Sequence, residues 1–254
     1  MSEQTTTFRP PSPDRPRIDE LGTILSIWAH PDDETYLAGG LMAAAAGAGQ
    51  RVVCVTATAG EQGTDDPETW PPLRLGRVRR PAAAAAMAVL GVGDHRVLGM
   101  PDGALADHAA QGLAAVRRLL DEVDPDTIVT FGPDGATFHP DHIQVHRWVA
   151  EAWRQRSQRG RLLWSATTTH HLEEFQGLYE TWGVYMTDER PTGVPPERTA
   201  LRLVLDGDDL ERKLDALRAM PTQTGDVFAS MDLGVFASVV AEEAFVAAAT
   251  TRTP

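Results

Sequence analysis

Two short segments of the chain contain the triplet His-Pro-Asp, and both could supply ligands to a metal ion. They are His30-Pro31-Asp32-Asp33-Glu34 and His139-Pro140-Asp141-His142. With 8 histidines and 18 prolines in 254 residues, chance supplies only about 0.05 such triplets. Imidazole and carboxylate are the groups that zinc binds when thiolates are absent, and Cys54 is the single cysteine of the chain. The two segments therefore indicate a metal site built from histidine and aspartate.

The residue types match a catalytic zinc site, which takes three protein ligands and leaves one position open. His30, His142 and one carboxylate of Asp32 or Asp33 supply such a set, and spacing alone leaves open which aspartate binds the metal. The other aspartate can then take a proton from an attacking water, and His139 can protonate a leaving group or stabilise an oxyanion. Helix capping explains the prolines and aspartates, but it leaves the histidine before each proline unexplained, because a helix N-terminus disfavours a cation.

The elements around the two segments alternate between strand and helix. Short apolar or β-branched runs predict strands, and alanine-rich or amphipathic runs predict helices. The predicted strands cover 23–29, 51–58, 127–131, 162–167 and 199–205, and the predicted helices cover 36–48, 77–90, 113–123, 140–156, 209–219 and 236–248. Glycine and proline mark long loops at 59–76 and 187–198.

This alternation predicts an α/β fold with a Rossmann-like, mostly parallel sheet and helices on both faces. Ligands of such sheets bind at the carboxyl ends of the strands. Both His-Pro-Asp segments lie there, and the loops 59–76 and 187–198 are expected to border the mouth of the site. We expect one domain over residues 20–250, preceded by a flexible, proline-rich arm over residues 1–19.

Charge and composition exclude several classes of protein. A net charge of −13 argues against a nucleic-acid binder, which needs a basic surface. No run approaches the roughly 18 uncharged apolar residues of a membrane span, and the polar N-terminus lacks the apolar core of a secretory signal. We therefore expect a cytoplasmic protein. The glycine-rich signatures of nicotinamide enzymes, phosphate loops and serine hydrolases are absent from the sequence.

The strings AHPDDE at 29–34 and HPDH at 139–142 resemble the PIG-L/LmbE family of zinc-dependent N-acetylglucosaminide deacetylases. The family includes the deacetylases of mycothiol, bacillithiol and glycosylphosphatidylinositol synthesis. The similarity covers most of residues 22–150, with supporting strings TAGEQG at 58–63, LGMPDG at 98–103 and TFGPDG at 130–135. The resemblance implies a hydrolase with one Zn²⁺ per chain, or another divalent ion on the same ligands. It would remove the N-acetyl group from a glucosamine-containing small molecule.

The resemblance also implies roles for individual residues. His30, Asp33 and His142 would be the zinc ligands, with Asp32 as the general base. His139 would act as the acid or oxyanion stabiliser. Asp141 would orient His139.

Two further residues are implied as substrate contacts, and the chain departs from the family pattern near them. Arg79 would contact the sugar or its aglycone, and Asp102 a sugar hydroxyl. The family often has an acidic residue where Ala82 stands, which would leave Arg79 free to meet a substrate phosphate or carboxylate. It often has a histidine before Ser-Gln late in the chain, where the sequence reads AMPTQ at 219–223, and some members have a tyrosine at the place of Thr137. These differences leave the aglycone of the substrate open.

Other residues have two interpretations at this stage. His146 shares a helix face with His142 and could be an alternative ligand or pack behind the site. At most one of His170 and His171 would face the site, because neighbouring strand residues point to opposite faces. Trp70 could cover a sugar ring or anchor its own loop.

Two other functions also stay open. One is a zinc amidase that acts on a different acyl amide or on a thiol-sugar conjugate. The other is a sugar- or metal-binding protein without turnover, against which Asp32 argues, because a pure binder has no use for a base beside an open metal position. Whether the chain forms a homo-oligomer is also open.

Overall fold

The structure, a computed structural model, describes residues 17–249. Its seven strands form one sheet in the order β3-β2-β1-β4-β5-β7-β6. The strands are β1 (Ile24–Trp28), β2 (Val52–Thr56), β3 (Asp94–Val97), β4 (Thr127–Thr130), β5 (Arg161–Ala166), β6 (Leu201–Val204) and β7 (Glu242–Ala247). β1 to β5 are parallel, whereas β7 runs antiparallel to both β5 and β6. The predicted α/β fold with a mostly parallel sheet is confirmed.

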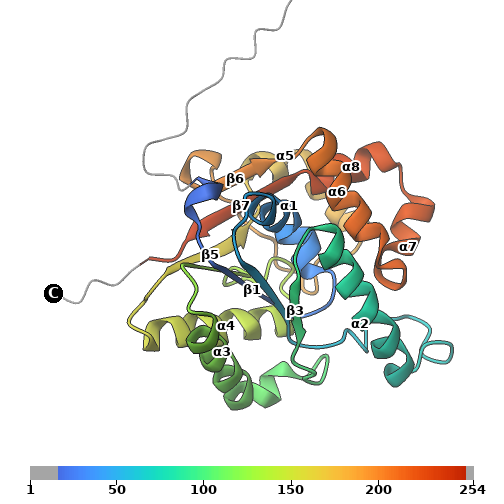
Figure 1. Cartoon of the computed structure of the whole chain (residues 1–254). Helices are drawn as coiled ribbons and strands as arrows, with labels where there is room; N and C mark the ends of the chain where they lie inside the picture. Colours follow the sequence, from blue (N-terminus) through green and yellow to red (C-terminus); the bar gives the residue numbers. More distant parts are fainter. Residues whose placement is uncertain (1–16, 250–254) are drawn as a thin grey trace, which may run out of the picture.

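Helices cover both faces of this sheet (Figure 1). They are α1 (Asp33–Gly47), α2 (Pro72–Val89), α3 (Ala109–Val123), α4 (Pro140–Gln155), α5 (Thr169–Thr181), α6 (Gly207–Arg218), α7 (Pro221–Ser230) and α8 (Leu233–Val240), with short 3-10 turns η1 (Ile18–Glu20), η2 (Leu105–His108) and η3 (Pro196–Arg198). α1 and α2 both pack against α6, while α3 packs against α4 on the other side of the sheet. Because β1, β2 and β4 lie between these layers, they are buried along their whole length and can be nearly continuous apolar runs.

The strand order reverses between β1 and β4, and this point positions the site. From β1 the chain moves outward to β2 and β3, then returns to place β4 on the free side of β1. The connections after β1 and β4 therefore lead to opposite faces and leave a crevice at the carboxyl ends of these strands. His30 follows β1, and His139 follows the loop after β4. The topology thus brings together two segments that are more than 100 residues apart in the sequence.

The last predicted helix, 236–248, is wrong over its second half. Residues 233–240 form α8, but 242–247 form β7, which lies between β5 and β6. The segment is rich in alanine and glutamate, which favour helix. Pairing with two strands and burial of Phe245 override that local preference.

The long loop after β2 is shorter than expected. α2 begins at Pro72 rather than at residue 77, because proline suits the first helical turn, where its missing N–H costs nothing. β3, α5 and α7 were not predicted from the sequence. Of the expected arm over 1–19, residues 1–16 lie outside the described residues, and Ile18–Glu20 form a 3-10 turn. Between residues 17 and 249, no helix has both the length and the apolar character that a membrane crossing requires.

Candidate metal centre

Donor atoms of three residues converge at the carboxyl ends of β1 and β4. His30 Nδ1 lies 3.1 Å from His142 Nε2 and 3.4 Å from Asp33 Oδ2, and His142 Nε2 lies 3.3 Å from Asp33 Oδ1. In a tetrahedral zinc centre with bonds of about 2.0–2.1 Å, two ligand atoms are separated by about 3.3 Å. The spacing of these atoms therefore fits a zinc ion, and His30, Asp33 and His142 are the residues that could hold it.

The outer ring nitrogens of both histidines have partners that fix the ring orientation. His30 Nε2 lies 3.0 Å from Asp102 Oδ1 and 3.3 Å from Asp141 Oδ2. His142 Nδ1 donates to the carbonyl oxygen of Gly135 over 2.9 Å. A metal-binding histidine usually donates its other N–H to such a group. The arrangement leaves His30 Nδ1 and His142 Nε2 as the atoms available to a metal.

The charges around His30 favour a cation. Burial lowers the pKa of His30, but hydrogen bonds with Asp102, Asp141 and Asp33 outweigh this and raise that pKa well above its usual value. For Asp33, burial raises the pKa, but the neighbouring His142 and His30 outweigh it and lower that pKa. Burial lowers the pKa of His142 to about 4, so its ring is neutral near neutral pH and could bind a metal. Three carboxylates around one imidazole thus provide the negative charge that a divalent ion needs.

Asp32 lies beside the ligands in an uncommon backbone conformation. It precedes the first residue of α1 and has φ +117°, which is strained for a residue other than glycine. Its N–H donates to Glu34 Oε1 over 3.1 Å, and its carbonyl oxygen accepts the N–H groups of Thr35 and Tyr36. Burial and then the charge of Asp33 raise the pKa of Asp32 to about 7. A carboxylate with such a pKa suits a general base near neutral pH.

His139 caps α4 with its own side chain. Its Nδ1 accepts the N–H of Asp141 over 3.1 Å, so in the neutral ring the proton is on Nε2, which can donate. Burial and the nearby His30 lower the pKa of His139. Its ring stacks against His142 at 4.8 Å between centroids. A neutral histidine can therefore cap a helix. Helix capping thus also explains why a histidine stands before Pro140.

Asp141 contacts a different histidine from the one expected. Its carboxylate faces His30 and accepts the N–H groups of Gly103 and Leu105 at 2.8 and 3.1 Å. No hydrogen bond joins this carboxylate to His139 among the described residues; only the Asp141 N–H reaches that ring. The expectation that the Asp141 side chain orients His139 is therefore wrong. The N–H groups of Gly103 and Leu105, in the segment before α3, hold the carboxylate beside His30.

Two other groups of donor atoms lie close enough to hold a metal ion. They are His30-His139-His142 and His30-Asp102-Asp141, each with all its atoms within 4.8 Å of one another. In the second group the carboxylates already accept backbone N–H groups from Gln62, Gly103 and Leu105, as orienting residues do. In the first group one nitrogen of His139 is used by the helix cap. The set with Asp33 combines both histidines with a carboxylate: its oxygens lie 3.4 Å from His30 Nδ1 and 3.3 Å from His142 Nε2, and Oδ2 also accepts the His30 N–H over 2.7 Å.

Comparison with known proteins places this chain in a family. The family described as PIG-L, GlcNAc-PI de-N-acetylase, matches residues 25–153, which include all the residues of the centre. The 1D-myo-inositol 2-acetamido-2-deoxy-alpha-D-glucopyranoside deacetylase of Mycobacterium sp. (strain KMS) is 31% identical over 239 residues, covering 83% of this chain and 77% of that protein. The chain belongs to the GlcNAc-PI de-N-acetylase family.

Solved structures share the fold of this family member at lower identity. The N,N'-diacetylchitobiose deacetylase from Pyrococcus horikoshii has a TM-score of 0.62 at 22% identity, covering 89% of this chain and 83% of that one. The 4-carboxy-2-hydroxymuconate hydratase from Pseudomonas putida KT2440 has a TM-score of 0.58 at 17% identity, covering 92% and 98%. These two proteins are named for different reactions, so the fold alone does not decide the chemistry.

In this GlcNAc-PI de-N-acetylase family member, Arg79 supports a loop. It is only 6% exposed, and its guanidinium donates to the carbonyl oxygens of Gly60, Gly63 and Thr222 at 2.7, 2.5 and 3.2 Å. These carbonyls take the place of the acidic partner that Ala82 cannot provide. The geometry favours a role for Arg79 in holding the loop and the start of α7 over the expected contact with a substrate.

Asp102 is likewise engaged within the protein. One carboxylate oxygen faces His30 Nε2, and the other accepts the N–H of Gln62 over 2.8 Å. Burial raises the pKa of Asp102, but the hydrogen bond with His30 outweighs it and lowers that pKa. The structure therefore places Asp102 as a partner of His30, and the contact with a sugar hydroxyl stays a prediction.

The remaining candidates from the sequence are resolved by their contacts. His146 Nδ1 donates to the carbonyl oxygen of Phe131 over 2.9 Å, behind the centre, so packing is the interpretation that the geometry supports. His170 is exposed, whereas His171 is buried and bonded to the Tyr179 hydroxyl over 2.7 Å. Trp70 lies under the Arg74 guanidinium at 4.8 Å, which favours an anchor for its own loop.

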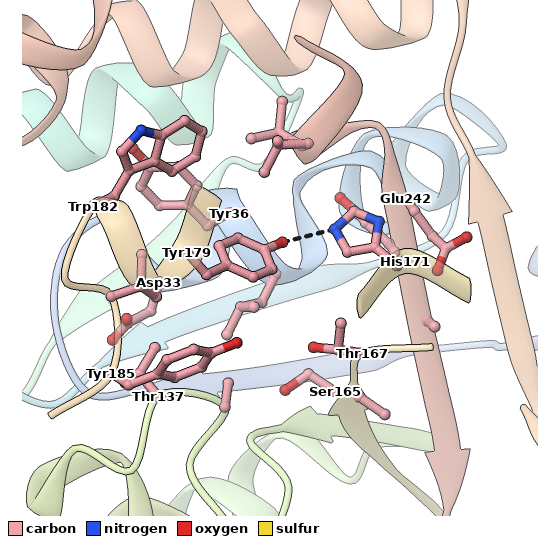
Figure 2. Close-up of a pocket in the computed structure, with 18 of the residues that line it drawn as sticks. Asp33, Tyr36, Thr137, Ser165, Thr167, His171, Tyr179, Trp182, Tyr185 and Glu242 are labelled. Atoms are coloured by element: carbon pink, nitrogen blue, oxygen red, sulfur yellow. Dashed lines mark hydrogen bonds between the residues drawn. The ribbon is translucent and has the colours of Figure 1, made fainter. Parts of the chain in front are cut away.

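A cavity of about 380 Å³ adjoins the centre. Asp33 and His142 form part of its wall, and aromatic side chains from α1, α5 and the segment after α5 form much of the rest (Figure 2). The sequence analysis missed this wall because α5 was not predicted. Neither 59–76 nor 187–198 contributes a lining residue. The expectation that both loops border the mouth is therefore wrong for this cavity, and the first loop lies instead beside Asp102 and Arg79.

Proposed function

We propose that the chain is a zinc-dependent hydrolase that removes the N-acetyl group from a glucosamine-containing small molecule. The observation that carries the proposal is the convergence of His30 Nδ1, Asp33 and His142 Nε2 at tetrahedral spacing, with Asp32 beside them. The related deacetylase from Mycobacterium is named for such a substrate, which supports the class of reaction.

Each residue of the centre then has a defined task. His30, Asp33 and His142 would hold the ion, and the chemistry that a zinc ion supplies when bound there is polarisation of a carbonyl and acidification of water. Asp32 takes a proton from the water that attacks the acetyl carbon. His139 donates from Nε2 to the oxygen on which negative charge develops. The carboxyl of Asp32 can afterwards return its proton to the leaving amine, so that acetate and a free amine are the products.

Asp102 and Asp141 serve this chemistry through His30. Their carboxylates hold the outer nitrogen of His30, which keeps its Nδ1 directed at the ligand position. Such partners also increase the basicity of a ligating histidine. They are positioning residues in the proposal.

Metal content and acetate release test the proposal together. The purified chain should contain about one zinc per chain and release acetate from at least one member of a panel of N-acetylglucosaminides, including the inositol glycoside named for the relatives. Treatment with a chelator should abolish the release, and added zinc should restore it. A metal-loaded protein that releases acetate from none of the panel would favour the alternative of a sugar- or metal-binding protein.

The cytoplasmic location expected from the acidic composition remains a prediction, which cell fractionation tests.

A further inference from the structure

We infer that the cavity beside Asp33 and His142 binds an uncharged apolar group of the substrate, about the size of an aromatic ring. This inference rests on the proposed function and names the class of substrate at that site. The cavity measures about 380 Å³, within the lower range of small-molecule sites, and the methyl group of an acetamide would fill only a small part of it.

The walls of the cavity are apolar and aromatic. Tyr36 and Phe236 are in edge contact at 6.4 Å between centroids, and Tyr179 contacts both Trp182 and Tyr185 at 6.4 and 6.2 Å. Figure 2 shows Tyr179 and Tyr185 next to each other near Asp33, with Trp182 above them. Rings arranged in this way favour contact with apolar or aromatic ligand surface.

Several polar groups of the cavity are engaged within the protein. The Tyr179 hydroxyl bonds to His171, and the Tyr185 hydroxyl donates to Gln176 Oε1. An exception is Ser165, which is 5% exposed and whose hydroxyl makes no hydrogen bond among the described residues. In Figure 2 the Ser165 hydroxyl points into the cavity from the end of β5. A buried hydroxyl without a partner costs free energy, and a polar atom of the ligand could pair with it.

The charges of the wall away from Asp33 and His142 disfavour an anionic group. None of the residues that line the cavity in the described part of the chain is lysine or arginine. The carboxylates deep in the wall are Glu242, which accepts from Arg202, and Glu243, which accepts from the fully buried Lys213. Because both are paired, the part of the wall away from Asp33 and His142 offers no counter-ion to a phosphate or carboxylate.

The apolar group could be attached to the substrate in two ways, as the aglycone of the sugar or as the acyl chain of the amide. Both share the chemistry that the wall recognises, and two series of compounds separate them. One series keeps the N-acetyl group and varies the glycoside from methyl through butyl to phenyl. The other keeps the methyl glycoside and varies the acyl group from acetyl through hexanoyl to phenylacetyl.

We expect kcat/KM for amine release to rise by about 10- to 100-fold from the methyl to the phenyl compound in one of the two series, as burial of a ring predicts. The phenyl compound should also exceed its 4-carboxyphenyl counterpart. Equal kcat/KM values along both series would overturn the inference while leaving the deacetylase proposal intact.

Direct binding distinguishes failure of the inference from failure of the proposed function. Calorimetry measures the affinity for each compound and does not depend on turnover. The compounds are the phenyl and methyl glucosaminides, and the methyl glycosides of N-phenylacetyl and N-acetyl glucosamine. A stronger affinity for a phenyl-bearing compound in the absence of any amine release would support the cavity and count against the hydrolase. Identical affinities within both pairs would count against the cavity, whatever the turnover.

A matched pair of variants locates the effect. Val239 is 6% exposed and lines the cavity, whereas Val235, one helical turn earlier on α8, is 41% exposed and does not. Val239→Phe fills the cavity and should reduce the phenyl-to-methyl ratio of kcat/KM and of affinity to near one. Val235→Phe should leave both ratios unchanged. An unchanged ratio in Val239→Phe, in a protein whose circular dichroism matches the wild type, would overturn the placement of the apolar group.

Discussion

At the scale of single residues, the centre shows how the surroundings give similar side chains different roles. Asp32 and Asp33 are neighbours, yet the pKa of Asp33 is lowered while burial raises that of Asp32 to about 7. The difference arises because Asp33 faces His30 and His142, whereas Asp32 has no histidine at hydrogen-bond distance among the described residues. Two carboxylates whose pKa values are pushed apart are typical of an acid–base site.

Asp32→Asn tests the role of the base. We expect this variant to retain zinc and to lose about 10²- to 10⁴-fold in kcat, because general base catalysis contributes that much. Zinc content and acetate release are measured on the same preparation. Asp65→Asn, in the exposed part of the loop after β2, is the control and should behave as the wild type. Turnover close to normal in Asp32→Asn would show that another group takes the proton.

The two histidines of the second segment should differ in their effect on the metal. His142→Ala removes a ligand, so zinc content should fall to a small fraction of one per chain. His139→Ala should keep the zinc and lose turnover, since its Nδ1 serves the helix cap and its Nε2 would donate to the developing oxyanion. Elemental analysis of both variants, with the exposed His170→Ala as control, decides the assignment. Loss of zinc in His139→Ala with retention in His142→Ala would mean that the roles are exchanged.

At the scale of elements, loops and helix ends hold the centre in place. The loop after β2 has few apolar anchors, and Arg79 of α2 binds two of its carbonyl oxygens together with one of α7. A buried guanidinium that donates to three carbonyl oxygens contributes more to the free energy of unfolding than a surface charge does. The reason is that each buried carbonyl left without a partner costs free energy. The loop in turn gives Asp102 the N–H of Gln62, so α2 supports His30 indirectly.

Arg79→Ala should therefore act through the loop. We expect a loss of about 1–3 kcal/mol in the free energy of unfolding, from unsatisfied carbonyls, and faster proteolysis within residues 60–71. Arg77→Ala, on the exposed side of the same helix, is the matched control. Urea unfolding and limited proteolysis are the measurements. If Arg79→Ala unfolds like Arg77→Ala but has a raised KM, Arg79 contacts the substrate and the original expectation from the sequence stands.

At the scale of the whole molecule, one buried ion pair joins three elements. Lys213 of α6 donates to Glu243 of β7 over 2.7 Å and to the carbonyl oxygen of Tyr36 in α1, and neither charged side chain is exposed. Glu243 also accepts the N–H groups of Gly40 and Leu41. The C-terminal part of the chain thus holds α1, which carries Asp33 at its first turn.

Lys213→Met should destabilise the whole domain by about 3–5 kcal/mol, because it leaves a buried carboxylate without its counter-charge. Adding Glu243→Gln should recover part of the loss, since the amide oxygen can still accept from α1 without a charge. Chemical denaturation of the wild type, the single variant and the double variant measures the coupling. A double variant less stable than Lys213→Met would mean that the pair does not act as a unit.

The sequence by itself predicted the two segments of the candidate centre and determined the class of the fold. His30 follows an apolar run, whereas Asp33 and His142 lie in the first turn of a helix. The signals in the sequence for these places are local: residue type, strand periodicity and a proline at the helix start. Parallel strands then bring their carboxyl ends together whatever the rest of the chain does. For this reason the paired segments could be recognised without a structure.

Only the tertiary structure decided which partners those residues have and what lies beside them. Asp102 and Asp141 face His30, Arg79 binds backbone carbonyls, and the segment 242–247 is a strand between β5 and β6. None of these follows from local sequence, because each depends on contacts between segments far apart in the chain. A carboxylate or guanidinium takes the partner that packing brings within about 3 Å, and an alanine-rich segment takes the conformation that its neighbours pair with.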